Sequence, residues 1–152
     1  MLDFETFLFR CCVALGLGLL VGLDREFKHK PLGLRSYLLV SLGSAALCMI
    51  SLNIAENAAT DNYAFDLSRV VAGVVGGIGF LGAGAIMSNR SDGKLRGVGS
   101  GSLIWVVGII GIAVGFGYVK EATSVTVLAF LVLTIVGWLR DRFELQDTDE
   151  KS

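Results

Sequence analysis

The sequence has few of the residues on which metal sites, disulfide-bonded folds and nucleic-acid interfaces depend. Its 152 residues include one Pro, one His and three Cys, and only 18% are charged, whereas a soluble domain typically has about 25% charged residues. The single histidine, His29, has no cysteine or second histidine nearby to share a zinc ion. The formal net charge of −1 gives no general reason to bind nucleic acid. We therefore expect no metal, no cofactor and no nucleic-acid partner.

The chain also lacks the residue combinations that catalysis requires. Cys11, Cys12 and Cys48 all fall in apolar runs, where a cysteine usually serves as a small buried hydrophobe. No Ser/His/Asp or Cys/His arrangement is present that could activate a nucleophile. We expect no catalytic residues and no enzymatic activity.

Apolar residues and glycine are abundant instead: 53% of the residues are hydrophobic, and 20 are Gly. Apolar stretches cover residues 7–23, 36–54, 70–87, 98–119 and 123–139. Each approaches the roughly 20 residues that a helix needs to cross a hydrocarbon core of about 30 Å. The stretches are apolar on all sides, which excludes barrel strands, and a soluble protein of this size could not cover five such helices. The sequence predicts an all-α, polytopic bundle of about five transmembrane helices in one domain, 1–145, with a short polar tail, 146–152.

The distribution of Lys and Arg between the connections predicts the orientation. The segments 24–35 and 88–97 and the C-terminal tail together contain ten Lys and Arg, whereas the opposite side has only Arg69 and Lys120. Because short cytoplasmic loops carry the excess of positive charge, we expect the N-terminus outside and the C-terminus in the cytoplasm. Arg10 lies in the first turn of its span, where its long side chain can reach the membrane interface.

Charged residues at the membrane edges are the first candidate site. Asp24, Arg25 and Glu26 close the first span, and Arg35 opens the second. Each can bind an ion, a partner or its neighbours, and the alternative is a solvated loop that only sets topology. On the other side, Asp66 and Arg69 precede the third span. Asp66 or Ser68 suits the N-cap there, and the Asp66 carboxylate also suits the positive end of the helix dipole.

The third span is unusually rich in glycine. Residues 77–82 match G-x-G-x-x-G, but the motif lies inside an apolar run with no preceding strand, which argues against a dinucleotide site. Small residues let membrane helices approach closely, and so many glycines also weaken a helix. The alternatives are tight helix packing and a locally broken helix. The packing candidates are Gly73, Gly76, Gly77, Gly79, Gly82 and Gly84.

Aromatic residues fall into two groups. Trp105 lies about 10 Å into the fourth span, so we expect it to be a packing anchor whose indole N–H needs an internal acceptor. Tyr37, Tyr118 and Trp138 lie near span ends, where interfacial aromatic belts occur.

Taken together, these motifs resemble the membrane domain of the MgtC/SapB family. The resemblance rests on Gly-Leu-Asp-Arg-Glu at 22–26, Gly-Leu-Arg at 33–35, Leu-Val at 39–40, Arg69, Gly-Ile-Gly-Phe-Leu-Gly-Ala-Gly at 77–84 and Trp105, in that order. The chain departs from the family pattern at Asp24 (usually Glu), Leu32 (usually Ala), Ser36 (usually Thr) and in 99–104 before the Trp. Many members continue into a cytoplasmic ACT-like domain, and we expect none after Leu145 here.

The resemblance implies a bacterial inner-membrane protein that acts in magnesium limitation, acid stress or virulence. It implies a regulator that binds other membrane proteins, and the matching residues at the membrane edges and in 77–84 would be the sensitive positions. The alternative is a transporter or channel for Mg²⁺ or another small ion. The absence of Asp and Glu within all five predicted spans favours the regulator, because Mg²⁺ is normally held by carboxylates. Small helix faces also suit a homodimer.

Overall fold

The computed structural model describes the chain except residues 1, 28–31, 61–64, 89–94 and 150–152. The described elements are the helices α1 (Phe4–Phe27), α2 (Leu34–Thr60), α3 (Leu67–Gly84), α4 (Val98–Gly115) and α5 (Val119–Asp149), with the two-residue strands β1 (Met87–Ser88) and β2 (Leu95–Arg96). All five helices are long and apolar enough to cross a membrane. The predicted all-α bundle of five transmembrane helices is confirmed, and the chain is a multi-pass membrane protein.

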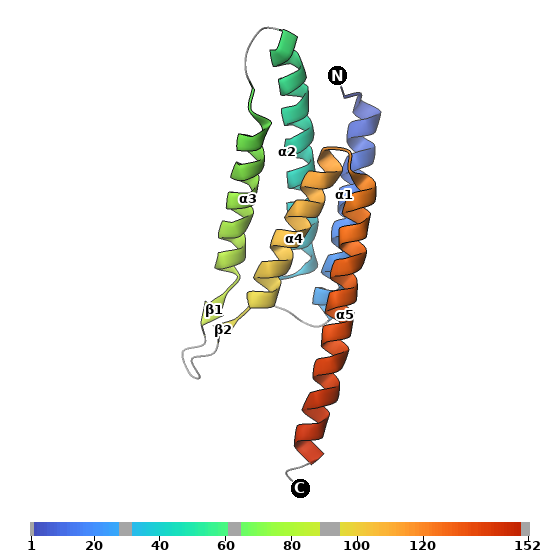
Figure 1. Ribbon diagram of the computed structural model, residues 1–152, viewed down its shortest axis with the longest axis vertical. Helices are drawn as coiled ribbons and strands as arrows, with labels where there is room; N and C mark the ends of the chain where they lie inside the picture. The colour runs from blue at the N-terminus through green and yellow to red at the C-terminus, as the bar shows by residue number, and fades with distance from the viewer. Residues whose placement is uncertain (1, 28–31, 61–64, 89–94, 150–152) are drawn as a thin grey trace.

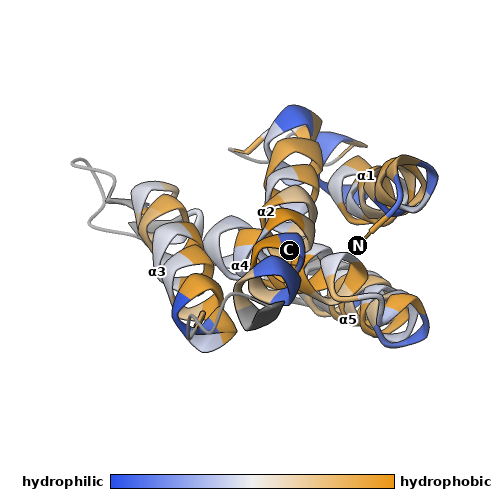
Figure 2. Cartoon of the chain, turned by 90° about the horizontal axis from the view of Figure 1, so that it is seen from above, coloured by the Kyte–Doolittle hydropathy of each residue, from blue (hydrophilic) through white to orange (hydrophobic). Residues whose placement is uncertain are grey.

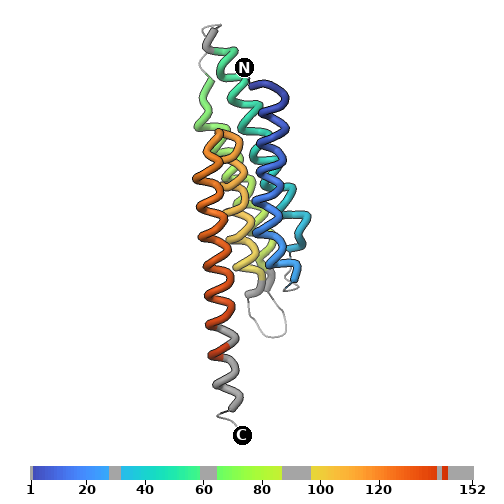
Figure 3. Tube along the Cα trace, turned by 90° about the vertical axis from the view of Figure 1, so that its right-hand side faces the viewer, coloured from blue at the N-terminus to red at the C-terminus, as the bar shows by residue number. Residues whose placement is uncertain are grey.

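The helices run up and down beside one another, and α5 extends beyond the others at its C-terminal end (Figure 1, Figure 3). We call the end of the bundle that holds the C-terminus of α1 and the N-termini of α2 and α4 the basic end, since the sequence puts most of its Lys and Arg there. His29, Lys28, Lys30, Arg90 and Lys94 also belong to this end in the sequence but lie outside the described residues.

Helix α4 is the centre of the bundle and packs against the other four helices. Seen along the bundle, α4 lies among its neighbours, whereas α3 stands at one edge (Figure 2). Of the residues of α4, 61% are buried, compared with 11% of those of α3, a helix of the same length. The core consists mainly of aliphatic side chains from α1, α2 and α4, such as Val21, Met49, Val107 and Ile110. Most of the surface of α3 is therefore left for lipid or for another protein.

Glycines of α4 explain why it fits at the centre. A methyl group at Gly115 would lie 2.6 Å from the carbonyl oxygen of Ala45 in α2, and one at Gly111 would overlap that of Ser41. At Gly108, it would overlap the side chain of Ile78 in α3. Only a residue without a side chain permits helices to approach this closely, as is common in membrane bundles.

The third predicted span extends three residues too far at its end. Helix α3 ends at Gly84, and Met87 pairs with Arg96 in an antiparallel β1–β2 ribbon. The return into α4 passes through Gly97, whose φ of +87° suits glycine and whose Cα lies so close to the Ala85 carbonyl that no side chain fits. Between Leu67 and Gly84, α3 is one continuous helix, so the alternative of a broken third span is wrong there.

Candidate functional site

Asp24 and Arg25 form a buried ion pair in the last turn of α1. The Arg25 Nε donates a hydrogen bond of 3.0 Å to Asp24 Oδ2, and Nη2 of Arg25 contacts the same oxygen. Both side chains are only 10% exposed. In a pair so far removed from water, removing Asp24 would take away the carboxylate that compensates the buried charge of Arg25.

Glu26 uses its carboxylate to cap the next helix. Its Oε2 accepts a hydrogen bond of 2.9 Å from the backbone N–H of Leu34, the first residue of α2. The negative charge thereby lies at the positive end of the α2 dipole and satisfies one of the free N–H groups of that helix. Arg35, in contrast, is exposed on the first turn of α2.

Tyr37 and Ser100 join the ion pair from two other helices. Tyr37 is fully buried rather than interfacial, so the expectation that it belongs to an aromatic belt is wrong. Its hydroxyl lies near Ser100 in the first turn of α4 and near the Asp24–Arg25 pair, but no hydrogen bond to it is formed within the described chain. The sequence did not predict that Tyr37 lies beside the ion pair, because neither the neighbours of Tyr37 nor its spacing from other apolar residues indicates that it is buried. The basic end therefore contains a buried polar cluster, Asp24, Arg25, Tyr37 and Ser100.

Asp66 and Arg69 lie at the opposite end of the bundle from this cluster. Asp66 is the N-cap of α3: its Oδ1 accepts hydrogen bonds from the Ser68 backbone N–H (2.9 Å) and the Ser68 hydroxyl (2.6 Å). These two bonds from Ser68 lower the pKa of the Asp66 carboxyl. Arg69 lies 3.4 Å from Asp66 Oδ2 and is largely exposed. The structure thus divides the charged candidates into two separate groups.

Arg10 of α1 contacts another helix, α4. Its Nη1 donates a hydrogen bond of 2.9 Å to the carbonyl oxygen of Gly115, in the last turn of α4. A cation there suits the negative end of the α4 dipole. Because Gly115 is the last residue of α4, the Arg10 guanidinium lies at the end of that helix. A second contact that the sequence did not predict joins the N-terminus to α2: the Asn53 side-chain oxygen accepts a hydrogen bond of 2.9 Å from the Leu2 backbone N–H.

The glycines of α3 do not share one role. Gly82 is buried against Gly101 of α4, where a methyl group would lie 3.0 Å from the Gly101 carbonyl oxygen. At the other five candidates, a methyl group would meet nothing within 4 Å in the described chain: Gly73, Gly76, Gly77, Gly79 and Gly84. Among the six, Gly82 alone packs closely against another helix within the described residues.

Trp105 faces outward from α4. Its side chain is 45% exposed, which differs from the internal packing anchor that its depth in the span suggested. The hydrogen bonds of the described chain include none from its indole N–H to an internal acceptor. Tyr118 and Trp138 are both more than half exposed, consistent with the belt positions expected for them.

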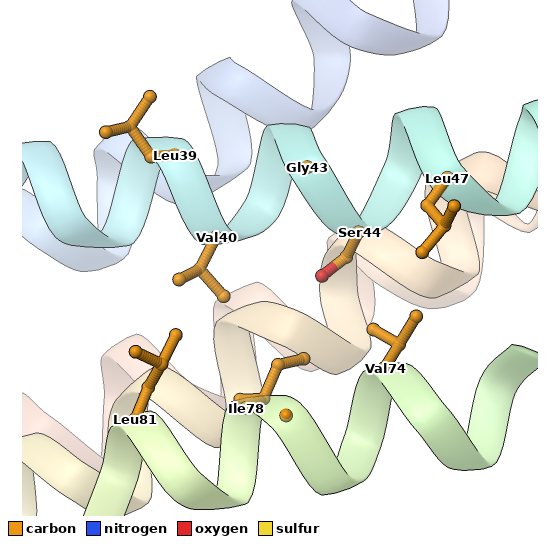
Figure 4. Close-up of a pocket in the computed structure, with 9 residues that line it drawn as sticks. Leu39, Val40, Gly43, Ser44, Leu47, Val74, Ile78 and Leu81 are labelled. Carbon is orange, nitrogen blue, oxygen red and sulfur yellow. The ribbon is translucent and has the colours of Figure 1, made fainter. Parts of the chain in front are cut away.

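An apolar groove of about 400 Å³ separates α2 from α3. Val40 and Leu47 of α2 lie opposite Val74, Ile78 and Leu81 of α3 (Figure 4). Leu39, Gly43 and Gly77 also line the groove, and the Leu39 side chain points away from α3. Its one polar side chain is Ser44, whose hydroxyl points into the groove (Figure 4). The described residues contain no group of three or more His, Cys, Asp or Glu side chains that could hold a metal ion.

Residues 11–142 of the chain match the MgtC family. This chain belongs to the MgtC family. It is 30% identical to the protein SapB of Bacillus subtilis over 128 residues, 84% of this chain and 55% of SapB. It is 32% identical to MgtC of Brucella abortus over 130 residues, 86% of this chain and 51% of that protein. The third relative, named a putative magnesium transporter, YhiD of Escherichia coli K12, is 33% identical over 116 residues, 76% of this chain and 53% of YhiD.

The chain spans about half the length of these relatives. No solved structure matches it. In this MgtC-family chain, the residues that carry the sequence resemblance have distinct positions: Asp24, Arg25 and Glu26 at the basic end, Arg69 at the other, and the 77–84 block along α3.

Proposed function

We propose that this MgtC-family chain is a regulatory protein of the bacterial inner membrane that binds other membrane proteins through the exposed side of α3. Its role would belong to adaptation to magnesium limitation, acid stress or virulence. We further propose that the basic end faces the cytoplasm, since it carries most of the Lys and Arg of the short connections.

The observation that supports this proposal most is the unfilled glycine surface of α3. Each glycine in a helix interior destabilises it by about 1 kcal/mol relative to Ala. Five glycines of α3 face open space, so they bring no packing within the chain that would offset this loss. Glycines on a membrane helix favour close approach by another helix. A helix of another protein packed against these five glycines would give them the packing role that they lack within the described chain.

Cross-linking in cells tests this proposal. A photo-activatable residue at Gly76, on the open surface of α3, should capture other membrane proteins, whereas one at Leu128, exposed on α5, should capture few. The matched variant Gly76→Leu should lose growth under magnesium limitation while keeping the fold. Equal capture from both helices, or unchanged growth of Gly76→Leu, would argue against α3 as the binding surface.

A transporter is the second candidate, and the buried cluster at the basic end is the observation that favours it. Buried ionisable side chains in membrane proteins often mark ion paths. However, Asp24 is paired with Arg25, and Arg10 is bonded to a backbone carbonyl. Purified protein in liposomes, assayed for Mg²⁺ and proton flux, distinguishes the two functions. Flux that Asp24→Asn abolishes while the fold is kept would replace the regulator with a carrier.

A further inference from the structure

The hydroxyl of Tyr37 is a buried polar group that has no hydrogen-bond partner within the part of the chain that the structure describes. Tyr37 itself is fully buried, and a phenol hydroxyl can both donate and accept a hydrogen bond. Other buried hydroxyls are bonded within the chain: Ser41 donates to the Ala14 carbonyl oxygen (2.7 Å) and Thr126 to that of Ala122 (2.8 Å). A buried polar group left without a partner is destabilising, so a bound group that bonds to Tyr37 is favoured.

The packing of Tyr37 holds this hydroxyl where three helices meet. A methyl group at Gly22 of α1 would lie 3.3 Å from Cβ and 3.5 Å from Cδ2 of Tyr37, so the absence of a side chain at Gly22 lets the ring lie against α1. Beyond the ring, the hydroxyl lies near Ser100 in the first turn of α4 and near the Asp24–Arg25 pair. Helix α1 ends where α2 and α4 begin (Figure 1). The Tyr37 hydroxyl is therefore enclosed with polar groups from both neighbouring helices.

The surroundings of the hydroxyl favour a small neutral molecule. Asp24 and Arg25 already compensate each other, so the charge of an added ion would remain uncompensated in a buried place. The side chains of the pair are only 10% exposed, Ser100 is 3% exposed and Tyr37 is fully buried, which leaves no open surface for a larger solute. A buried water molecule typically makes about three hydrogen bonds to polar groups of this kind.

We propose that a water molecule is bound where α1, α2 and α4 meet and bridges the Tyr37 hydroxyl to the Ser100 hydroxyl beside the Asp24–Arg25 pair. The N-cap of α4, Gly97, provides no side-chain hydrogen bond to the first turn of that helix. The bridge attaches this turn of the central helix to α2 and so fixes where α4 begins. The inference does not rest on the proposed function, which assigns protein binding to α3, so each can fail without the other.

Solid-state NMR of the full chain in liposomes detects such a water molecule directly. In a Tyr63→Phe, Tyr118→Phe background, Tyr37 is the only tyrosine, so a label on the tyrosine ring reports on it alone. Magnetisation should pass from water to the Tyr37 ring much faster than to Met49, which is equally buried but lies in the apolar core. Equally slow transfer to both residues would overturn the proposal.

The stability of Tyr37→Phe provides a second, independent measurement. Phenylalanine keeps the ring against Gly22 but removes the hydroxyl. Loss of the hydrogen bond to the water should raise the equilibrium constant for unfolding in detergent roughly fivefold. A variant as stable as wild type, or more stable, would show that the hydroxyl has no partner and would refute the bound water.

A double-mutant cycle tests whether Ser100 shares the same water. Tyr37→Phe and Ser100→Ala together should raise the unfolding constant by less than the product of their single effects, because both remove bonds to one molecule. Ser102→Ala is the matched control: Ser102 is exposed on the same helix and donates to the Val98 carbonyl oxygen (3.0 Å), so its effect should multiply with that of Tyr37→Phe.

Two results of this cycle contradict the bridge. Independent effects of Tyr37→Phe and Ser100→Ala would mean that the two hydroxyls share no partner. Coupled effects combined with slow magnetisation transfer from water to the Tyr37 ring would mean that Tyr37 and Ser100 bond to each other directly, without a water between them.

Discussion

Gly82 of α3 and Gly101 of α4 touch backbone to backbone. A methyl group at Gly101 would lie 2.6 Å from the Gly82 carbonyl oxygen, and one at Gly82 would lie 3.0 Å from that of Gly101. Both residues are buried, and the contact lies close to the Gly97 turn that joins the two helices. Since α3 packs little against α2, this crossing and the nearby contact of Ile78 with Gly108 attach α3 to the bundle.

Gly101→Ala should therefore destabilise the protein although alanine is the better helix former. The added methyl group forces the two helices apart, and overpacking of this kind typically costs about 1–3 kcal/mol. Gly79→Ala, in open space on the same bundle edge, should instead stabilise by up to about 1 kcal/mol. Unfolding in detergent, followed by circular dichroism, measures both. Equal stability of the two variants would contradict the close crossing.

Glu26 offers a test that separates its capping role from binding through its charge. Glu26→Gln keeps an oxygen that can accept the Leu34 N–H, whereas Glu26→Ala removes it. Loss of a helix N-terminal acceptor typically costs about 0.5–2 kcal/mol. We expect Glu26→Ala to lower the free energy of unfolding by that amount and Glu26→Gln by clearly less.

Growth under magnesium limitation provides the functional readout for the same pair of variants. If Glu26 acts as the α2 cap, Glu26→Gln should retain most of the function. Complete loss of function in a stable Glu26→Gln protein would instead assign the charge itself to an ion or a partner.

Asp66 should give the stability of the protein a dependence on acid pH. Hydrogen bonds from Ser68 lower its pKa below the ordinary 3.8, so the folded state favours the carboxylate. Its contribution is complete above the unfolded pKa and is lost as the pH falls through the folded pKa. Wild type and Asp66→Ala should thus differ in thermal stability at neutral pH, and the difference should shrink as the pH falls below 3.8 through the lower pKa of the folded protein. A difference that stays the same from neutral pH down to full protonation of the carboxyl groups would show that the carboxylate charge is not the cause.

Hydropathy was sufficient to predict the five helices, because each lipid-crossing helix must satisfy its own backbone hydrogen bonds and be apolar on most sides. It was not sufficient to assign individual residues within them. Gly82 and Gly79 look alike in the sequence, and only the crossing with α4 buries one of them. For Tyr37 and Trp105, the expected and observed burial are reversed. Tyr37, near a span end, is buried, whereas Trp105, deeper in its span, faces outward. Rotation of a helix about its axis decides such cases, and α4 is apolar all round.

For the charged residues too, the sequence predicts only those hydrogen-bond partners that are close in the chain. Local sequence narrowed the N-cap of α3 to Asp66 or Ser68, and the structure has Asp66 there, with its hydrogen-bond donors only two residues away. Glu26 and Arg10 bind backbone groups on other helices, 8 and 105 residues away. No local pattern reveals such partners, since they depend on which helix ends the bundle brings together.

Arg10 should stabilise the end of the bundle opposite the basic end through its bond to the Gly115 carbonyl oxygen. In Arg10→Met, the apolar stem remains, but the charged hydrogen bond to the C-terminal turn of α4 is lost, and bonds to charged groups typically contribute about 1.5–3 kcal/mol. We expect a decrease of this size in the free energy of unfolding, with insertion into the membrane unchanged. Arg10→Lys keeps a cation near the negative end of α4 and should recover part of the loss.

Lys120→Met, at an exposed position in the first turn of α5, removes a charge from the same end and serves as the control. If Lys120→Met destabilises the protein as much as Arg10→Met does, the effect comes from the net charge of that end, and the bond to Gly115 contributes nothing measurable.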